Sequence, residues 1–477
     1  MNDSCCASSE GNGDKPDLAV IGAGSAGFSA AIAAAEQGAR VALIAHGLIG
    51  GTCVNIGCIP SKTLIRAAET LYHGRTASRF AGIEAEARIA DWKAVVQQKD
   101  ALVAQLRQAK YADLLPAYNT IAYIEGAARL ADGGVRVNGA LIRAERIIVT
   151  TGARPALPPI PGIEEVDYLT STSALDLEEL PRSLLVIGGG YIGCELAQMF
   201  ARAGVGVTIL FRSRLLPEAE PEISEALAGY FKEEGITVQR VGGYDGIRTS
   251  DRGIALSVTI DGSAETLEAQ RVLLSAGRTP NTGGLGLEEA GITLLANGGI
   301  KVDDRMRTSR SGIYAAGDVT GRDQFVYMAA YGARIAAENA LNGDGRRYDA
   351  SAMPAVVFCD PQVASAGLTE AAARELGHDV KTSVLPLDAV PRALAARDTR
   401  GLIKLVADAK TDRLLGGHIL APEGADSIQT MVMALKGRLT TRDLAETIFP
   451  YLTTVEGLKL AAQTFEKDVA MLSCCAG

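Results

Sequence analysis

Residues 50–62 read Gly-Gly-Thr-Cys-Val-Asn-Ile-Gly-Cys-Ile-Pro-Ser-Lys and contain two cysteines, Cys53 and Cys58. In a regular helix, a five-residue separation corresponds to a rise of roughly 7.5 Å, whereas the Cα atoms of a disulfide rarely lie more than about 7 Å apart. A bridge therefore requires a local distortion, which Gly57 can provide. Because Pro60 suits the first turn of a following helix, we expect Cys58 near a helix N-terminus, where the dipole favours a thiolate.

Length, composition and charge describe an ordinary globular protein. With 477 residues, 47% hydrophobic and 22% charged, the chain is long enough for two to four domains. A net charge of −9 without a basic cluster argues against a nucleic-acid partner. The uncharged run 18–35 is better explained by a strand, a glycine turn and a helix than by a membrane span. Residues 1–14 are polar and lack the pattern of a signal peptide, so we expect a cytoplasmic protein without stable membrane association.

The eight cysteines fit catalytic or metal-binding roles better than structural ones in such a reducing compartment. Lys62, four residues after Cys58, favours interpreting Cys53 and Cys58 as a redox-active pair over the alternative of two unrelated buried cysteines. Adjacent cysteines also occur at opposite ends of the chain, as Cys5-Cys6 and Cys474-Cys475. This placement is unusual enough to require an explanation.

A strand followed by a glycine turn predicts a first dinucleotide-binding fold. Residues 17–21 form an apolar strand, and a helix to Gln37 opens directly on the turn Gly22-Ala-Gly24-Ser25-Ala26-Gly27. Such glycines permit a tight turn, a close approach of the backbone to a pyrophosphate and a helix N-terminus that faces the anion. The second strand, residues 40–44, should end in an acidic residue for the adenosine ribose, but the chain has Ala45-His46 there.

The same pattern recurs in the middle of the chain, and it implies a second dinucleotide. An apolar strand at 184–187 leads into Gly188-Gly-Gly190-Tyr191-Ile192-Gly193, and residues 194–203 form the helix that follows. The next strand ends near Arg212 and Arg214, where an acidic residue would hold the 2′-hydroxyl of NADH. Two arginines suit a 2′-phosphate instead, which favours NADPH. The alternative is that these arginines belong to a solvated turn.

Further strand ends and a change of composition complete the organisation. A helix is expected over 90–110, and the apolar strand 146–152 closes on Thr151-Gly152 before a proline-rich domain boundary. Glycine turns recur at Gly277 and at Gly317-Asp318, where Asp318 is a candidate to bind a ribityl hydroxyl of a flavin. From residue 354 strands alternate and then give way to helices up to Phe465, which is typical of an α+β dimerisation domain.

These motifs together resemble the glutathione reductase and lipoamide dehydrogenase family of flavoprotein disulfide reductases, the class I pyridine nucleotide-disulfide oxidoreductases. The resemblance covers residues 15–465, and the motif at 50–62 is highly specific to it. It implies an α/β fold with two Rossmann-like domains, FAD in the first and NADPH in the second, and a homodimer with shared active sites. The expected boundaries are a flexible N-terminal tail (1–14), the FAD-binding domain (15–155 and, as its second, central part, 283–347), the NADPH-binding domain (156–282), the dimerisation domain (348–465) and a mobile Cys-Cys tail (466–477).

The resemblance also implies roles for individual residues. Cys53 would exchange with substrate, Cys58 would contact the flavin as a charge-transfer thiolate, and Lys62 would pair with Glu195 beside the flavin N5. Tyr191 would cover the nicotinamide pocket until NADPH enters. The residues expected to contact FAD are Gly22, Gly24, Ser25, Ala26, Gly27, Gly51, Thr52, Lys62, Gly126, Thr151, Gly152 and Asp318, and those expected to contact NADPH are Gly188, Gly190, Tyr191, Ile192, Gly193, Arg212, Arg214 and Gly277.

One position departs from the disulfide-reducing members of the family. They carry a His-Pro-Thr motif whose histidine protonates the departing thiolate, whereas residues 450–456 here read Pro-Tyr-Leu-Thr-Thr-Val-Glu, with Tyr451 in place of the histidine. None of the four histidines lies in this segment. General acid catalysis typically contributes 10²–10⁴-fold, so an enzyme that splits disulfides should keep its acid. An electron acceptor that needs no proton would not require it.

The C-terminal cysteines indicate what that acceptor is. Neighbouring cysteines form a disulfide only in a strained ring, so Cys474 and Cys475 are better suited to hold a soft metal ion. Together with Tyr451 they resemble the mercury-reducing branch of the family, which implies Hg(II) as substrate. Cys474 and Cys475 of the partner subunit would take Hg(II) from a thiol complex and pass it to Cys53 and Cys58, and Tyr191 and Tyr451 would orient or stabilise it there as phenol or phenolate neighbours.

Other interpretations remain open at this point. A large thioredoxin reductase also ends in paired cysteines but predicts a histidine at position 451. A soft-metal scavenger without catalysis predicts a protein without flavin. Cys5 and Cys6 are either a vestigial metal carrier or part of an inert chain end, and Cys194 and Cys359 are expected to be packing residues.

Overall fold

The computed structural model describes residues 15–472, which form two compact units. The first contains the chain up to Asn55, Leu102–Arg154 and Arg278–Tyr348, and the second contains Ile56–Ala101, Pro155–Gly277 and the chain from Asp349. The chain passes from one unit to the other near residues 55, 101, 154, 277 and 348. None of the helices among the described residues combines the length and the apolar character that crossing a membrane requires.

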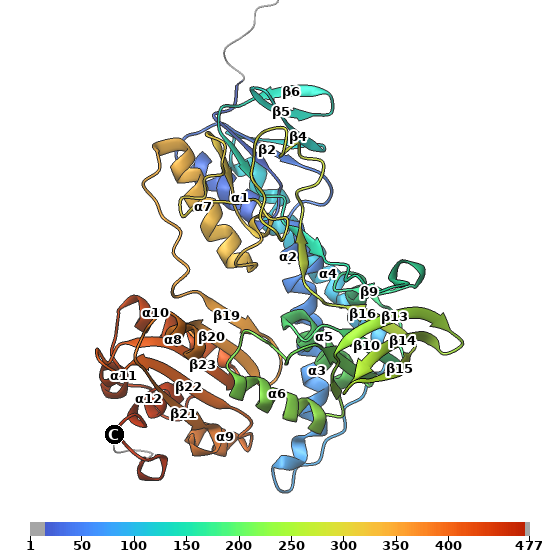
Figure 1. Ribbon diagram of the computed structural model, residues 1–477, viewed down its shortest axis with the longest axis vertical. Helices are drawn as coiled ribbons and strands as arrows, with labels where there is room; N and C mark the ends of the chain where they lie inside the picture. Colours follow the sequence, from blue (N-terminus) through green and yellow to red (C-terminus); the bar gives the residue numbers. More distant parts are fainter. Residues whose placement is uncertain (1–14, 473–477) are drawn as a thin grey trace, which may run out of the picture. The chain divides into compact units, whose positions relative to one another are not determined.

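The first unit is built on a five-stranded parallel sheet of order β18-β7-β1-β2-β3. The central strands are apolar and buried throughout, as expected for a sheet that is covered on both faces. Helices α1 and α7 lie side by side and share one hydrophobic core (Figure 1). The elements are β1 (Leu18–Ile21), α1 (Ser25–Ala35), β2 (Val41–Ala45), β3 (Ile121–Glu125), β7 (Ile147–Val149), β18 (Ile313–Ala315), α7 (Val326–Asn342) and the antiparallel β4 (Ala128–Ala131), β5 (Gly134–Val137) and β6 (Ala140–Arg143).

The second unit repeats this design with a parallel sheet of order β12-β11-β10-β16-β9. One hydrophobic core joins this sheet to α3, α5 and α6, and another joins it to a three-stranded antiparallel sheet. The elements are α3 (Cys58–Arg75), β9 (Leu169–Thr170), β10 (Ser183–Ile187), α5 (Tyr191–Arg202), β11 (Gly206–Phe211), α6 (Pro221–Glu233), β12 (Thr237–Arg240), β13 (Gly243–Ser250), β14 (Gly253–Ile260), β15 (Ser263–Ala269) and β16 (Arg271–Leu274).

The same unit contains a mixed α+β domain after residue 353. Its antiparallel sheet has the order β19-β20-β23-β22-β21, and α10 and α12 share its main hydrophobic core (Figure 1). The elements are β19 (Pro354–Val357), β20 (Gln362–Gly367), α8 (Glu370–Glu375), β21 (Val380–Pro386), α9 (Pro391–Ala396), β22 (Leu402–Asp408), β23 (Leu414–Ala421), α10 (Gly424–Lys436), α11 (Thr441–Glu446) and α12 (Glu456–Gln463). Together with the two parallel sheets, this domain confirms the predicted fold class.

The remaining elements used below are the helices α2 (Gly51–Ile56) and α4 (Trp92–Lys110) and the paired strands β8 (Ala153–Pro155) and β17 (Arg278–Pro280). At the C-terminal end, Val469–Met471 form a 3₁₀ turn, and Val469 and Leu472 pack against the core of the α+β domain. Cys474 and Cys475 lie outside the described residues, as do Cys5 and Cys6.

Candidate functional site

The cysteine segment has the break that the sequence predicted. Helix α2 ends at Ile56, α3 begins at Cys58, and Gly57 between them has φ −130° and ψ −113°. Cys58 is the first residue of α3, and Pro60 is buried in its first turn. Both Cys53 and Cys58 are half-buried. A thiol at the first position of an 18-residue helix lies where the dipole favours its ionised form.

The first glycine turn has no room for side chains at Gly22 and Gly27. Gly22 has φ +115°, and a Cβ there would lie 2.4 Å from the carbonyl oxygen of Thr150. A Cβ on Gly27 would lie 1.7 Å from the carbonyl oxygen of Gly22, and one on Gly51 would lie 2.6 Å from the Cα of Gly24. No side chain caps the N-terminus of α1, which begins directly after Gly24. Exposed backbone N–H groups at this close turn fit the pyrophosphate of a dinucleotide.

The second glycine turn reproduces this geometry. Gly188 has φ +118°, and a Cβ there would lie 2.5 Å from the carbonyl oxygen of Ser275. A Cβ on Gly193 would lie 1.9 Å from the carbonyl oxygen of Gly188, and no side chain caps α5 after Gly190. This turn therefore fits a second dinucleotide. Ile192 lies in the first turn of α5, and Gly277, with φ +114°, follows the neighbouring strand β16.

Two hydroxyl residues hold these turns in shape, and the sequence analysis missed both. Thr150 Oγ1 donates to the carbonyl oxygens of Ile21 at 2.9 Å and Gly22 at 3.1 Å. Ser275 Oγ donates to those of Ile187 at 3.0 Å and Gly188 at 3.1 Å. A signal was present, because both hydroxyls follow an apolar strand and precede a glycine by two residues, in the matching segments 146–152 and 271–277.

Removing each hydroxyl should weaken binding at its own turn. We expect Thr150→Val to cost about 1 kcal/mol of folding stability, because two buried carbonyl contacts are lost, and to weaken flavin retention. Ser275→Ala should weaken NADPH binding and leave flavin retention unchanged. Each variant serves as the control for the other in urea unfolding and cofactor titrations. Equal losses of both cofactors in both variants would contradict separate roles.

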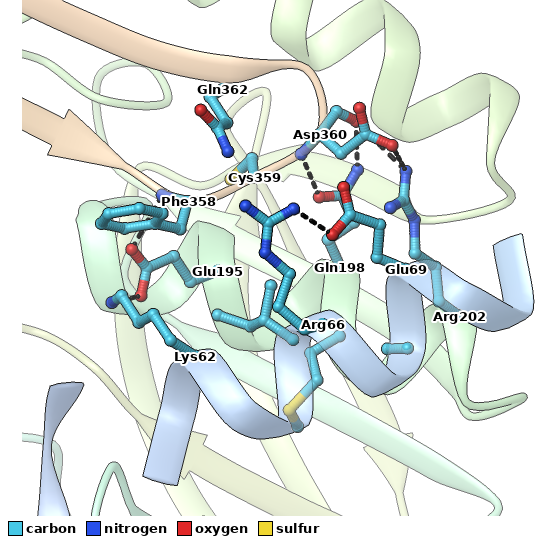
Figure 2. A pocket seen from close by; sticks show the side chains of 13 residues that line it. Lys62, Arg66, Glu69, Glu195, Gln198, Arg202, Phe358, Cys359, Asp360 and Gln362 are labelled. Atoms are coloured by element: carbon cyan, nitrogen blue, oxygen red, sulfur yellow. Dashed lines mark hydrogen bonds and ion pairs between the residues drawn. The ribbon is translucent and has the colours of Figure 1, made fainter. Parts of the chain in front are cut away.

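Lys62 and Glu195 form an ion pair in the second unit. Lys62 Nζ lies 2.7 Å from Glu195 Oε2, and this carboxylate is only 6% exposed (Figure 2). Its other oxygen accepts a hydrogen bond from the backbone N–H of Phe358 at 2.9 Å. Glu195 is the fifth residue of α5, and Lys62 is the fifth residue of α3. These two helices thus bring together side chains 133 residues apart.

Tyr191 begins α5 and is half-buried. Burial, with a smaller contribution from Glu218, raises the pKa of Tyr191 to about 12. The side chain is therefore a neutral phenol at physiological pH. Of the two roles considered for it, phenol or phenolate, the surroundings favour the phenol.

The two arginines after β11 have different surroundings. Arg212 is exposed. Arg214 Nη2 instead donates to the backbone carbonyls of Pro217 at 2.6 Å and Ala219 at 2.8 Å, and its Nε is buried without a hydrogen-bond partner among the described residues. Arg214 thus shapes the turn that follows, and Arg212 has the more accessible guanidinium for a phosphate.

This difference predicts the coenzyme selectivity of two variants. If Arg212 binds a 2′-phosphate, Arg212→Ala should raise the KM for NADPH roughly tenfold and leave that for NADH nearly unchanged, because a charge-assisted contact would be lost. Arg214→Ala should mainly lower thermal stability. Steady-state kinetics with both coenzymes measure the effect, and Arg248→Ala, an exposed arginine on β13, is the control. A similar loss with NADH and NADPH would remove Arg212 from phosphate recognition.

The remaining residues expected at the flavin lie in the first unit, apart from Lys62. Asp318 begins a 3₁₀ turn after Gly317, and its Oδ2 lies 3.6 Å from Arg278 Nε. Burial raises the pKa of Asp318, and Arg278 opposes that rise. Thr151 Oγ1 donates to the carbonyl oxygen of Asn281 at 2.7 Å. Gly126 and Gly152 both have positive φ at strand ends, Ser25 and Ala26 begin α1, and Thr52 lies in α2.

Tyr451 lies in the α+β domain, shortly before α12, and its exposed fraction is 53%. The backbone N–H of Leu452 donates to Glu456 Oε2 at 3.2 Å, which fixes the turn around it. His378 Nδ1 lies 3.1 Å from Asp408, and His418 Nε2 lies 3.0 Å from the carbonyl oxygen of Leu368. These histidines belong to other parts of the domain, so the segment around Tyr451 contains no imidazole.

Cys194 and Cys359 are buried in one hydrophobic core, as expected for packing residues. Burial raises the pKa of both thiols well above the ordinary range. Cys194 Sγ lies 3.5 Å from the carbonyl oxygen of Gly189. Neither thiol is placed to act as a thiolate nucleophile.

Comparisons with known proteins all indicate the same family of flavoprotein oxidoreductases. Residues 16–337 match the family described as "Pyridine nucleotide-disulphide oxidoreductase", and residues 353–462 match its dimerisation domain. A mercuric reductase of Lysinibacillus sphaericus is 48% identical to this chain, over 98% of this chain and 85% of the relative. A mercuric reductase of Streptomyces lividans is 46% identical, over 97% of this chain and 98% of the relative. Two solved structures cover 95% and 94% of this chain and all of theirs. They are a Cu(II) complex of the HOCl-induced flavoprotein disulfide reductase RclA from Escherichia coli, with a TM-score of 0.84 and 33% identity, and LpdA from Mycobacterium tuberculosis, with 0.82 and 27%.

Proposed function

The chain belongs to the pyridine nucleotide-disulphide oxidoreductase family as a flavin-dependent mercury(II) reductase, and we propose that it reduces Hg(II) to volatile Hg(0) with NADPH through Cys53 and Cys58. The observation that carries the choice of acceptor is Tyr451, which stands where disulfide-reducing relatives would carry an acid. The match of residues 353–462 to the family's dimerisation domain supports a homodimer. We place the enzyme in the cytoplasm.

The chain's own residues account for both cofactor sites. The turn at Gly22–Gly27 would hold the pyrophosphate of FAD, and Asp318 a ribityl hydroxyl. The turn at Gly188–Gly193 would hold NADPH, with Arg212 on its 2′-phosphate and Tyr191 over the nicotinamide pocket. When bound, these cofactors supply a hydride and relay its two electrons. We assign 15–155 and 283–347 to FAD, 156–282 to NADPH and 348–465 to dimerisation.

The cysteines handle the substrate. Hg(II) would arrive as a dithiol complex and be taken by Cys474 and Cys475 of the partner subunit. Thiolate exchange would then move it to Cys53 and Cys58, and the position of Cys58 at the start of α3 supports its ionised form. Overall, NADPH and Hg(II) give NADP⁺, Hg(0) and one proton. Hg(0) binds thiolates weakly and leaves, so no proton donor is needed at this step.

Two assays separate this function from its alternatives. The enzyme should oxidise NADPH when Hg(II) is added in excess thiol and should fail to support thioredoxin-coupled insulin reduction. The reverse pattern would indicate a large thioredoxin reductase. Purified protein without yellow flavin and without metal-dependent NADPH oxidation would indicate a soft-metal scavenger.

A further inference from the structure

The Lys62–Glu195 pair is held by one backbone group, the N–H of Phe358, which directly follows β19 of the α+β domain. Glu195 Oε2 lies 2.7 Å from Lys62 Nζ, and Oε1 accepts from the Phe358 N–H at 2.9 Å. Lys62 Nζ also lies 4.8 Å from the centroid of the Phe358 ring. Both oxygens of this buried carboxylate therefore have partners, and the position of Phe358 determines how Glu195 is oriented (Figure 2).

Helix α5 holds the segment that contains Phe358 at a second point. Gln198 Oε1 accepts from the Asp360 N–H at 2.8 Å, and Gln198 Nε2 donates to the Asp360 carbonyl oxygen at 2.8 Å. Gln198 is 3% exposed and follows Glu195 by three residues, so both lie on one face of the helix. The two side chains bind backbone groups on either side of the buried Cys359.

A buried ion network closes around the same segment. Arg202, one turn further along α5, places Nη2 2.9 Å from Asp360 Oδ2, and Arg400 places Nη2 3.2 Å from Asp360 Oδ1. The Arg202 guanidinium lies 3.9 Å from the centroid of the Tyr72 ring on α3. Lys62 and Tyr72 both lie on α3. Helix α3 therefore contacts α5 at the ion pair and again near the C-terminal end of α3.

We propose that Gln198 is a positioning residue for the Lys62–Glu195 pair. By holding the backbone of Asp360, it fixes the Phe358 N–H that orients Glu195, and Glu195 in turn fixes the Lys62 ammonium. The inference rests on the proposed function together with the family resemblance, which implies that this pair lies beside the flavin. The electrostatic effect of a charge near a reacting group depends on such preorganisation.

Gln198→Leu in the FAD-loaded enzyme tests this, because leucine keeps a similar volume and loses both hydrogen bonds to Asp360, together with the one that Gln198 Nε2 donates to Glu234 Oε1 at 3.0 Å. Flavin reduction by NADPH in stopped flow should slow about tenfold, and the equilibrium midpoint potential of the flavin should shift. Gln362→Leu is the matched control, since Gln362 is also buried and accepts from the backbone N–H of Ala425 at 2.9 Å. It should leave both readouts at their wild-type values.

A double mutant distinguishes positioning from general damage. In a Glu195→Gln background, Gln198→Leu should add less than about a twofold change, because the carboxylate that it positions is gone. If Gln198→Leu fails to fold, Gln198→Asn, which keeps an uncharged amide but shortens its reach by one methylene, should slow reduction about threefold. The proposal would be overturned if the effects of Glu195→Gln and Gln198→Leu on the rate of flavin reduction multiplied fully in the double mutant. Equal effects of Gln198→Leu and Gln362→Leu on that rate would also overturn it.

The outcome can be told apart from a failure of the proposed function. An enzyme that does not reduce Hg(II) but shows the expected flavin readouts supports the role of Gln198 and refutes the substrate. A Glu195→Gln variant with an unchanged flavin potential removes the pair from the flavin and overturns the role of Gln198.

Discussion

Replacing Cys58 with serine is expected to lower Hg(II)-dependent NADPH oxidation by roughly 10³-fold or more, an effect of the size seen when a reacting nucleophile is removed. Serine cannot form a disulfide, and its hard oxygen is a poor ligand for a soft ion. It also lacks the thiolate that the start of α3 favours. The measurement is steady-state NADPH oxidation with Hg(II) in excess thiol, and Cys53→Ser should behave similarly.

A buried cysteine provides the control for this loss. Cys359→Ala removes a thiol that is 2% exposed and lies in a hydrophobic core. It should lower thermal stability and retain most of the turnover. If Cys58→Ser keeps a substantial part of the wild-type rate, or if Cys359→Ala loses as much, the assignment of the redox pair is wrong.

The second large effect is expected at the C-terminus. Replacing Cys474 and Cys475 together with alanine should slow turnover of thiol-bound Hg(II) about 10²-fold, because transfer between thiolates would lose its first acceptor. Reduction of the flavin by NADPH should proceed at the wild-type rate, since the proposed role of these cysteines concerns the ion alone. Stopped-flow flavin reduction and steady-state turnover, measured on the same preparation, separate the two steps.

The other terminal pair is the matched control. Cys5 and Cys6 are also adjacent, so Cys5→Ala with Cys6→Ala makes the same chemical change at the opposite end of the chain. That variant should turn over like the wild type if this end is inert. Unchanged turnover after loss of Cys474 and Cys475 would take the tail out of the pathway, and a loss confined to the Cys5 and Cys6 variant would make that end the metal carrier.

Local features were predicted correctly because their causes are local. The glycine turns after β1 and β10 need backbone that no side chain allows, so the residue types alone indicate them. The break at Gly57 follows from the same reasoning together with Pro60. The strands expected to alternate after residue 354 are present as the antiparallel sheet of β19 to β23.

Features that depend on the path of the chain could not be predicted. Arg214 looks like a phosphate ligand in the sequence, yet the turn from Pro217 to Ala219 brings two carbonyl groups to its guanidinium. Gln198 and Asp360 are 162 residues apart, and no local pattern connects them. The grouping of Ile56–Ala101 with the second unit likewise arises from packing of α3 on α5.

The central claim is that the electrons of NADPH reduce Hg(II), and one stoichiometric measurement tests this directly. NADPH oxidation and mercury vapour should be recorded together while the purified yellow enzyme turns over Hg(II) in excess thiol. We expect about one Hg(0) released per NADPH oxidised, in keeping with a two-electron transfer, and negligible NADPH oxidation with glutathione disulfide as the acceptor. Rapid NADPH oxidation by glutathione disulfide without mercury vapour from Hg(II) would contradict it.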